Sequence, residues 1–263
     1  MADDLIILLI TGLAAGLLGG LLGIGGGVVL MPVLRFVVGL PPAEAAGTCV
    51  LAVFFTTLGG GIKHYRLGHV PIRGLGPVIL AGVLSTLVFS ALFLFLARHG
   101  RWLDFGIGCV FALIALRMVL DTLAEKSATP EPPAAAPMIT GSNAQKTILG
   151  VVAGILPGLL GIGTGAVLVP GFSYLLKAPI KVAIGSALVC FCANALISAV
   201  MKYAQGYVNL TLALPVCLGC LAGSQLGAVI NHRMPSRALK LMFGLVFAWV
   251  SFRFIASGLG GTP

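Results

Sequence analysis

Two short glycine-rich motifs are the part of this sequence whose residue types and spacing could do chemistry. The first glycine loop, residues 23–27, reads Gly-Ile-Gly-Gly-Gly, and the second glycine loop, residues 161–165, reads Gly-Ile-Gly-Thr-Gly. Clustered glycine breaks a helix and lets a ligand approach the backbone closely. A helix that starts directly after such a break presents free N–H groups and a partial positive charge. Two of these helix starts, facing each other, would bind a small anion without a buried cationic side chain.

Polar side chains inside neighbouring apolar segments extend this candidate site. Thr48 and Ser186 are each followed eight residues later by a polar residue, Thr56 and Asn194. Eight residues make a little over two helical turns, so each pair lies on one helix face. The Asn194 amide and the Thr56 hydroxyl could donate to an anion, and Thr164 could either bind the anion or cap a helix. The candidate anion site therefore comprises Gly25, Gly26, Gly27, Gly163, Thr164, Gly165, Asn194, Thr56, Thr48 and Ser186.

Other interpretations of these residues stay open on the sequence alone. Glycine also lets membrane helices pack closely, and Gly219, Gly223 and Gly227 have the spacing of such a contact. Polar side chains within membrane helices can simply join one helix to another. A dinucleotide site or a P-loop is excluded, because no strand precedes either glycine loop and neither loop ends in Lys-Ser or Lys-Thr.

The two glycine loops belong to an internal repeat. Residues 16–32 recur as residues 154–170, and 12 of the 17 aligned positions are identical. The same offset continues without a gap, so that Pro41 falls on Pro179 and Tyr65 falls on Tyr203. Apolar composition alone does not produce ordered matches of Gly, Pro and Tyr, so the chain consists of two related halves.

The elements that position these residues must be membrane-spanning helices. The chain has 263 residues, of which 59% are hydrophobic and 9% are charged, whereas soluble domains carry about 25% charged residues. Each half contains five apolar segments, at about 5–22, 27–39, 46–62, 75–97 and 102–123, and at about 147–160, 165–177, 182–201, 212–231 and 238–258. We predict an all-α polytopic membrane protein with about 8–10 apolar segments.

The second segment of each half is too short to span a bilayer, which takes about 20 residues. The first two segments therefore form either a re-entrant hairpin or a pair of broken spans. Both arrangements give an odd number of crossings per half, and an odd number inverts the second half relative to the first. We expect two inverted-topology repeats with Gly-broken or re-entrant helices, as in many secondary transporters.

The basic residues indicate the orientation. With the N-terminus outside, the cytoplasmic connections hold ten Lys or Arg residues and the outer connections hold four, Arg35, Arg98, Arg101 and Lys202. Because positive residues concentrate on the cytoplasmic side, both termini are expected in the periplasm. The net charge of +9 does not indicate a nucleic-acid partner, since the basic residues lie singly or in small groups at segment ends.

The halves are separated by a stretch rich in Pro and Ala. Its composition predicts a flexible cytoplasmic linker at residues 124–146, between a first transmembrane repeat at 1–123 and a second, inverted repeat at 147–263.

The repeated motif resembles that of a known family. The sequence Gly-x-x-x-Gly-Leu-Leu-Gly-Ile-Gly-Gly-Gly from Gly16 is followed by Pro-x-x-x-Ala-x-Gly-Thr from Pro41 and by His-Tyr-x-x-Gly-x-Val from His64. This pattern, which covers both halves outside the linker, resembles the TauE/SafE family of sulfite exporters and toluenesulfonate-uptake permeases. The resemblance implies a carrier of the bacterial inner membrane for sulfite, sulfoacetate or another organosulfonate. Thr164 departs from the pattern, because it stands where the first loop has Gly26.

Three classes of function were weighed. A secondary transporter of small sulfur-containing anions by alternating access fits best, and a permease for another small anion or for a metal cation is the alternative. No metal site or cofactor is expected, because the seven acidic residues lie near segment ends or in the linker and Cys217-x-x-Cys220 lacks a second ligand pair. An enzyme is not expected, because no Ser-His or His-Glu constellation is visible. The expected partners are a small anion and the lipid bilayer, while the oligomeric state, the direction of transport and coupling, for instance through His64, stay open.

Overall fold

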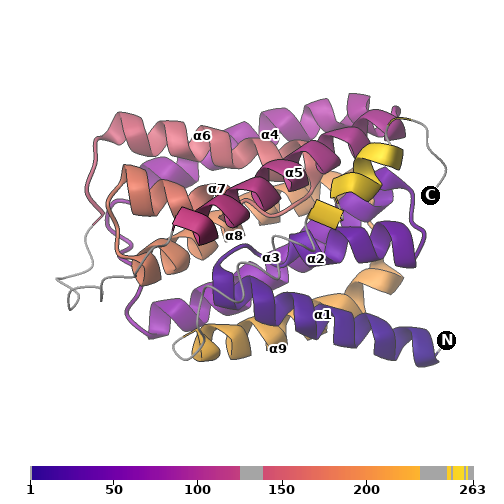
Figure 1. The fold of residues 1–263 in the computed structure, drawn as a ribbon, viewed down its shortest axis with the longest axis horizontal. Coiled ribbons are helices and arrows are strands. Elements are labelled where there is room, and N and C mark those ends of the chain that lie inside the picture. The colour runs from indigo at the N-terminus through magenta and orange to yellow at the C-terminus, as the bar shows by residue number, and fades with distance from the viewer. Residues whose placement is uncertain (1, 125–138, 232–247, 250, 258, 260–263) are drawn as a thin grey trace.

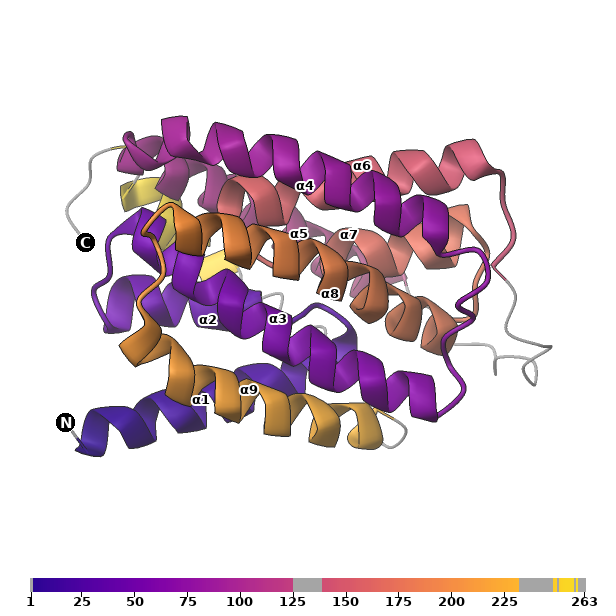
Figure 2. The same ribbon diagram turned by 180° about the vertical axis from the view of Figure 1, so that it is seen from behind.

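The protein folds as a bundle of long helices (Figures 1 and 2). The structure is a computed structural model that describes all residues except 1, 125–138, 232–247, 250, 258 and 260–263. Within the described residues all regular structure is helical and no strand occurs. The predicted fold class, an all-α polytopic protein, is therefore confirmed.

The helices follow the same order in both halves. The first half contains α1 (Ala2–Leu22), α2 (Gly27–Pro32), the π-helical turn η1 (Val33–Val37), α3 (Pro42–Arg66), α4 (Gly76–Ala97) and α5 (Gly100–Ala124). The second half contains α6 (Asn143–Leu160), α7 (Gly165–Pro170), the π-helical turn η2 (Gly171–Leu175), α8 (Ile180–Ala204) and α9 (Leu210–Ile230). Six of these helices, α1, α3, α4, α6, α8 and α9, are long and apolar enough to cross a membrane.

Two sequence predictions fall wholly or partly outside the described residues. The tenth apolar segment, 238–258, overlaps 232–247, and the predicted linker, 124–146, overlaps 125–138. On the described side of the linker, α6 begins with a capping box in which Ser142 and Gln145 bond each other's backbone N–H groups. The division into two repeats and a linker stays a prediction.

The two halves share their local backbone structure. Hydrogen bonds that close the turns after η1 and α3 recur after η2 and α8, between residues that are equivalent in the repeat. The matched donor and acceptor pairs are Leu40–Leu34 with Ala178–Phe172, and Gly68–Tyr65 with Gly206–Tyr203. In Figure 1, α1 and α6 begin at opposite ends of the bundle, as inverted repeats require. Their inversion across a membrane stays a prediction.

Rows of glycine bring helices of different halves into backbone contact. α1 packs against α9, and the equivalent helix α6 packs against α4. A Cβ atom on the glycines of these rows would overlap a carbonyl oxygen of the partner helix, at Gly12, Gly16 and Gly20 in α1, Gly150 and Gly154 in α6, and Gly219, Gly223 and Gly227 in α9. The packing interpretation of the α9 glycines is therefore confirmed.

The short second segment of the first half folds back on the helix before it. α2 and η1 together make one helix from Gly27 to Val37, about 16 Å long at 1.5 Å per residue. The chain folds back at the first glycine loop, where a Cβ atom on Gly26 would lie 2.7 Å from the Ala15 carbonyl oxygen of α1. α1 and α2 run in opposite directions in Figure 1. Whether this hairpin enters a membrane as a re-entrant hairpin or as a pair of broken spans stays a prediction.

An ion pair holds the end of the first hairpin that lies away from the glycine loop. Arg35 of η1 donates to both carboxylate oxygens of Asp104 in α5, with a shortest Nη2–Oδ2 distance of 2.9 Å, and also to the Leu40 carbonyl. Nearby, the Arg253 guanidinium lies 5.3 Å from the centroid of the Phe36 ring. Both arginines thus hold helix ends together at this end of the bundle.

Candidate functional site

The two glycine loops meet inside the protein, backbone against backbone. A Cβ atom on Gly163 would overlap the carbonyl oxygen of Ile24, and one on Gly165 would overlap the carbonyl oxygen of Gly23. A Cβ atom on Gly27 would lie 3.0 Å from the amide nitrogen of Gly163. Since only glycine permits so close an approach, the motif itself allows the two helix breaks to lie side by side.

The loops turn through different backbone conformations. In the first loop, Gly23, Gly25 and Gly26 have φ angles of 72°, 83° and 71°, in the left-handed region that glycine adopts without strain. Within the fully described second loop only Gly161 is left-handed, and Thr164 has a φ of −99°. Because a threonine would be strained in the conformation of Gly26, the substitution accompanies a different turn. The two loops are therefore not strictly symmetrical.

Each loop leads directly into a helix whose first N–H groups precede the helical hydrogen bonds. In α2 the first such bonds are donated by Val29 and Leu30, and in α7 by the repeat-equivalent residues Val167 and Leu168. The N–H groups of Gly27 and Gly165 stand before these donors, in the first turn, where a helix carries its partial positive charge. The structure thus brings the starts of α2 and α7 together where the two glycine loops touch.

Thr164 carries a hydroxyl group that the protein itself does not use. The residue is completely buried, and its Oγ1 has no hydrogen-bond partner among the described residues. It precedes α7 without capping it through its side chain, so the capping interpretation is wrong. A buried polar group without a partner costs about 1–3 kcal/mol, and this hydroxyl is therefore free to donate to a ligand.

Side chains of α3 and α8 line the place where the two glycine loops touch. Phe191 of α8 touches both loops, because a Cβ atom on Gly25 would overlap its ring and one on Gly163 would lie 3.5 Å from the ring. Cys49 of α3 lies on the other side, with its Sγ atom 3.6 Å from the Gly27 carbonyl oxygen. Val53 and Thr57 of α3 also contact the loop glycines, so aromatic, thiol and aliphatic groups line this contact.

Thr48 and Thr56, the two candidate site threonines of α3, lie in different surroundings. Thr56 is beside the first loop, where its Oγ1 would be 3.4 Å from a Cβ atom on Gly26, and its hydroxyl donates to the Ala52 carbonyl at 3.1 Å. Thr48 instead accepts a hydrogen bond of 3.1 Å from the Asn209 amide at the start of α9. The structure thus places Thr56 at the loops and joins Thr48 to a neighbouring helix.

Ser186 and Asn194 of α8 are buried with unpartnered oxygen atoms. Within the described part of the chain, neither the Ser186 hydroxyl oxygen nor Oδ1 of Asn194 has a hydrogen-bond partner. The Asn194 amide faces α4, where a Cβ atom on Gly82 would lie 2.7 Å from it. Both residues therefore offer polar groups in the interior, Asn194 on the side of α8 that faces α4.

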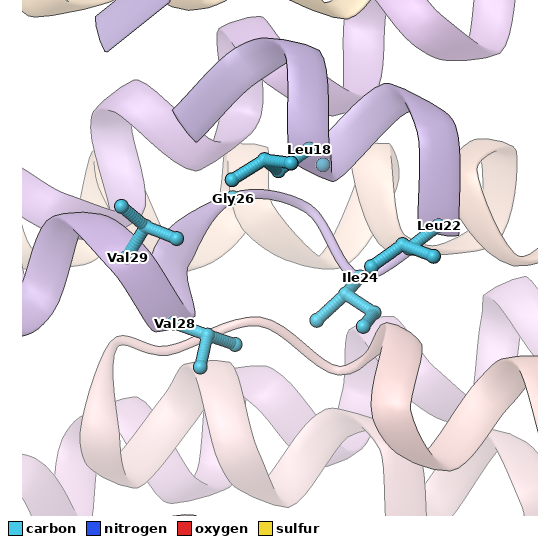
Figure 3. A pocket seen from close by; sticks show the side chains of 7 residues that line it. Leu18, Leu22, Ile24, Gly26, Val28 and Val29 are labelled. Carbon is cyan, nitrogen blue, oxygen red and sulfur yellow. The ribbon is translucent and has the colours of Figure 1, made fainter. Parts of the chain in front are cut away.

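A small recess beside the first glycine loop has an apolar lining (Figure 3). It is formed by Leu18, Gly19, Leu22, Ile24, Gly26, Val28 and Val29. Figure 3 shows Ile24 and Val28 directed away from α1, toward the neighbouring loop. Because no polar side chain lines the recess, we do not assign the anion to it.

Sequence reasoning missed Lys202, which it placed in an outer connection. The side chain is completely buried in the last turn of α8. Its Nζ donates to the Pro157 carbonyl at 2.9 Å, the Gly158 carbonyl at 2.7 Å and the Ser198 hydroxyl at 3.0 Å. Lys202 therefore joins α8 to the end of α6, directly before the second glycine loop. The sequence signal that could have found it is the repeat, since Lys202 is the repeat equivalent of His64.

Comparison with known proteins assigns the family. The family model described as Sulfite exporter TauE/SafE matches residues 8–254, which include both glycine loops. The chain belongs to the TauE/SafE family. A probable membrane transporter protein, YunE of Bacillus subtilis, is 28% identical over 97% of this chain and 98% of its own length. A probable membrane transporter protein of Haemophilus influenzae is 30% identical over 93% of this chain and 96% of its own length.

A relative that is similar over part of the chain carries the family's name. The Sulfite exporter TauE/SafE family protein 1 of Arabidopsis thaliana is 31% identical over 41% of this chain and 25% of its own length. No solved structure matches the fold. The family and the six apolar helices together make this chain a multi-pass membrane transporter.

Proposed function

We propose that this transporter carries small sulfur-containing anions, namely sulfite, sulfoacetate or another organosulfonate, across the bacterial inner membrane. The anion binds where the two glycine loops meet, and alternating access exposes that point to one side of the membrane at a time. The observation that carries the proposal is the contact of the two loops beside the buried, unpartnered hydroxyl of Thr164. The family name supports the class of substrate.

The chemistry of the site suits an oxyanion. Sulfite and sulfonates present three oxygen atoms that share the negative charge, and each oxygen accepts hydrogen bonds. The first-turn N–H groups before α2 and α7 and the Thr164 hydroxyl are donors on fixed backbone. Helix starts stabilise negative charge through aligned peptide dipoles. Backbone and hydroxyl donors hold the anion at the loops, while the buried Lys202 ammonium is bound by the carbonyl groups at the end of α6.

The ten residues of the candidate site have different roles in this proposal. The loop glycines, Gly25, Gly26, Gly27, Gly163 and Gly165, allow the close approach and supply N–H donors. Thr164 and Ser186 contribute hydroxyl groups that have no hydrogen-bond partner among the described residues, and Asn194 contributes the N–H groups of its amide. The Thr56 hydroxyl turns from the Ala52 carbonyl to the anion, and Thr48 holds α3 to α9 near the site.

Transport requires the two hairpins to separate. Because the loops touch through their backbones, an anion reaches the N–H groups only when one hairpin moves away from the other. Inverted repeats support such a motion, since each half can open toward one side of the membrane. Because basic residues concentrate on the cytoplasmic side of a membrane, both termini face the periplasm in this proposal, and the connection between α3 and α4 faces the cytoplasm.

Transport by purified protein in liposomes tests the proposal. Radiolabelled sulfite and sulfoacetate are offered to sealed vesicles, with sulfate, phosphate and Zn²⁺ as the other candidate substrates and protein-free vesicles as the control. We expect saturable entry of a sulfur anion that the Thr164→Val variant weakens. If monodisperse protein moves none of the sulfur anions, the proposed substrate class is wrong. Entry of phosphate or Zn²⁺ alone would favour the alternative permease.

A further inference from the structure

Each glycine loop follows a helix end whose carbonyl groups contact a basic side chain. Nζ of Lys202 donates to the Gly158 carbonyl in the last turn of α6 at 2.7 Å. Nε2 of His64 lies 3.3 Å from the Gly20 carbonyl oxygen in the last turn of α1. The repeat aligns Lys202 with His64 and Gly158 with Gly20. The two contacts are therefore equivalent in the repeat.

The contacts satisfy a need that the helix breaks create. The last carbonyl groups of a helix have no partner within the helix and carry a partial negative charge. α1 and α6 end among buried residues, including Leu21 and Leu160, where lipid and side chains replace water. A basic donor at this point fixes the helix end, and the helix end fixes where the glycine loop begins.

The helix end before the second loop is held strongly. Lys202 uses all three ammonium donors, two on α6 carbonyls and one on the Ser198 hydroxyl, at 2.7–3.0 Å. Ser198 also donates to the Pro157 carbonyl, and the Phe93 ring covers the ammonium with its centroid 4.3 Å from Nζ. Hydrogen bonds from a charged donor are roughly twice as strong as neutral ones.

The helix end before the first loop is held more weakly. His64 makes one contact with it, at 3.3 Å, while its Nδ1 lies 3.3 Å from Nδ1 of His69. Asn231, at the end of α9, donates to the Leu21 carbonyl. Gly60 occupies the position equivalent to Ser198 and offers no hydroxyl. A neutral amide and an imidazole thus replace the ammonium and hydroxyl of the second half.

The two contacts come from helices, α3 and α8, that pass to the next helix at opposite ends of the bundle. His64 is in the last turn of α3 and Lys202 is in the last turn of α8. Figure 2 shows α3 passing to α4 at one end of the bundle and α8 passing to α9 at the other. Releasing His64 therefore loosens the first hairpin at one end, and releasing Lys202 loosens the second hairpin at the other.

We propose that His64 and Lys202 are the positioning residues of the two glycine loops. Because His64 binds its helix end more weakly than Lys202 does, the first loop moves out of its place more readily than the second. This inference rests on the proposed function for its meaning in transport. The carrier then opens more easily at the end of His64, the predicted cytoplasmic end. Exchanging the two residues reverses the preference.

Amide hydrogen exchange followed by mass spectrometry tests the positioning without any substrate. In the unchanged protein, peptides over residues 19–30 exchange faster than the equivalent peptides over 157–168. Lys202→His raises exchange in the second region, on the order of tenfold, as two charge-assisted bonds are lost. His64→Lys slows exchange in the first region. The double variant inverts the order, and Lys63→His, a similar substitution at a half-buried neighbour, changes neither region.

Transport provides the second readout. In vesicles with one protein orientation, the KM for sulfite is measured from each side, and the ratio of the two values is compared among the variants. The single exchanges move this ratio in opposite directions, and the double exchange inverts it. A merely structural role would lower the amount of active protein without changing the ratio.

The outcomes separate the two proposals. The positioning roles are overturned if each variant changes amide exchange equally in both loops. They are also overturned if amides of the second loop exchange faster than those of the first in the unchanged protein. If exchange inverts but no sulfur anion is carried, the positioning stands and the proposed function fails. Should Lys202→His not fold, Ser198→Ala keeps the ammonium and removes one of its partners. It is expected to raise exchange in the second region alone by a smaller factor, and no change there contradicts the proposal.

Discussion

The first and second glycine loops have nearly the same sequence but different chemistry. The first loop contains three left-handed glycines and apolar neighbours, and the hydroxyl beside it, that of Thr56, already donates to the backbone. The second contains one left-handed glycine, the unpartnered hydroxyl of Thr164 and, at the helix end before it, the ammonium of Lys202. The repeat therefore preserves the glycine break in both halves, while the turns differ and the Thr164 hydroxyl and the Lys202 ammonium lie in the second half.

This difference indicates how a duplicated fold can specialise. Both halves need the glycine turn, because the hairpins must touch. Under the proposed function only one half needs the groups that distinguish an anion from water, so the other can keep a different turn. The predictions below test this division, from the largest expected effect to the smallest.

The close approach of the loops should be the most sensitive feature. Gly165→Ala places a Cβ atom on the Gly23 carbonyl oxygen, and backbone cannot move aside as a flexible side chain can. We expect a destabilisation of more than about 3 kcal/mol, seen as loss of monodisperse protein in gel filtration. Gly76→Ala is the matched control, because nothing lies within 4 Å of its Cβ position. Equal behaviour of the two variants would contradict the contact.

Exchanging the residues that differ between the loops should give unequal results. Gly26→Thr demands a φ of 71° from threonine beside the Ala15 carbonyl, and we expect it to cost about 1–3 kcal/mol or more. Thr164→Gly imposes no such strain and should fold, with a loss of roughly 0.5–1 kcal/mol from chain entropy. Thermal unfolding of both variants measures the difference. If Gly26→Thr is the milder change, the two turns are less distinct than the backbone indicates.

The hydroxyl of Thr164 should matter for binding and not for stability. Thr164→Val keeps the shape and removes a group without a partner, so the melting temperature should stay the same or rise. A hydrogen bond to a charged ligand contributes about 1.5–3 kcal/mol, so the KM for sulfite should increase at least tenfold. Thr56→Val is the comparison, and we expect a smaller change in KM because its hydroxyl already has an acceptor. Equal changes in KM would remove the distinction between the loops.

The smallest effects should separate Thr48 from its equivalent Ser186. Thr48→Val removes the acceptor of the Asn209 amide and should cost about 1 kcal/mol. Ser186→Ala removes an oxygen without a partner, and the free energy of unfolding should change by less than about 0.5 kcal/mol. Chemical denaturation in detergent can rank the two variants. A larger cost at Ser186 would reveal a partner that the hydroxyl finds in solution.

Much of the fold could be predicted from the sequence. Long apolar runs specify membrane helices because a bilayer leaves no other way to satisfy the backbone. Clustered glycine predicted the breaks at residues 23–27 and 161–165, since such positions cannot sustain a helix. That α2 folds back on α1 depended on where α2 packs, which local sequence does not determine.

The candidate site was only partly predictable. The loop glycines were found because a repeated motif marks them, and Thr164 because it interrupts that motif. Lys202 was misplaced because a lysine near the end of an apolar segment usually marks topology. Without Lys202 the outer connections hold three basic residues instead of four, so the charge bias toward the predicted orientation becomes stronger.

The sequence by itself determined that the chain enters a membrane, that its second half repeats the first and that each half breaks at glycine. These properties follow from hydropathy and backbone conformation, which act within a few residues of one another. Only the tertiary structure decided that the breaks touch, that the Thr164 hydroxyl has no partner within the described part of the chain and that Lys202 meets the end of α6. Such contacts join residues far apart along the chain, and their existence depends on how whole helices pack.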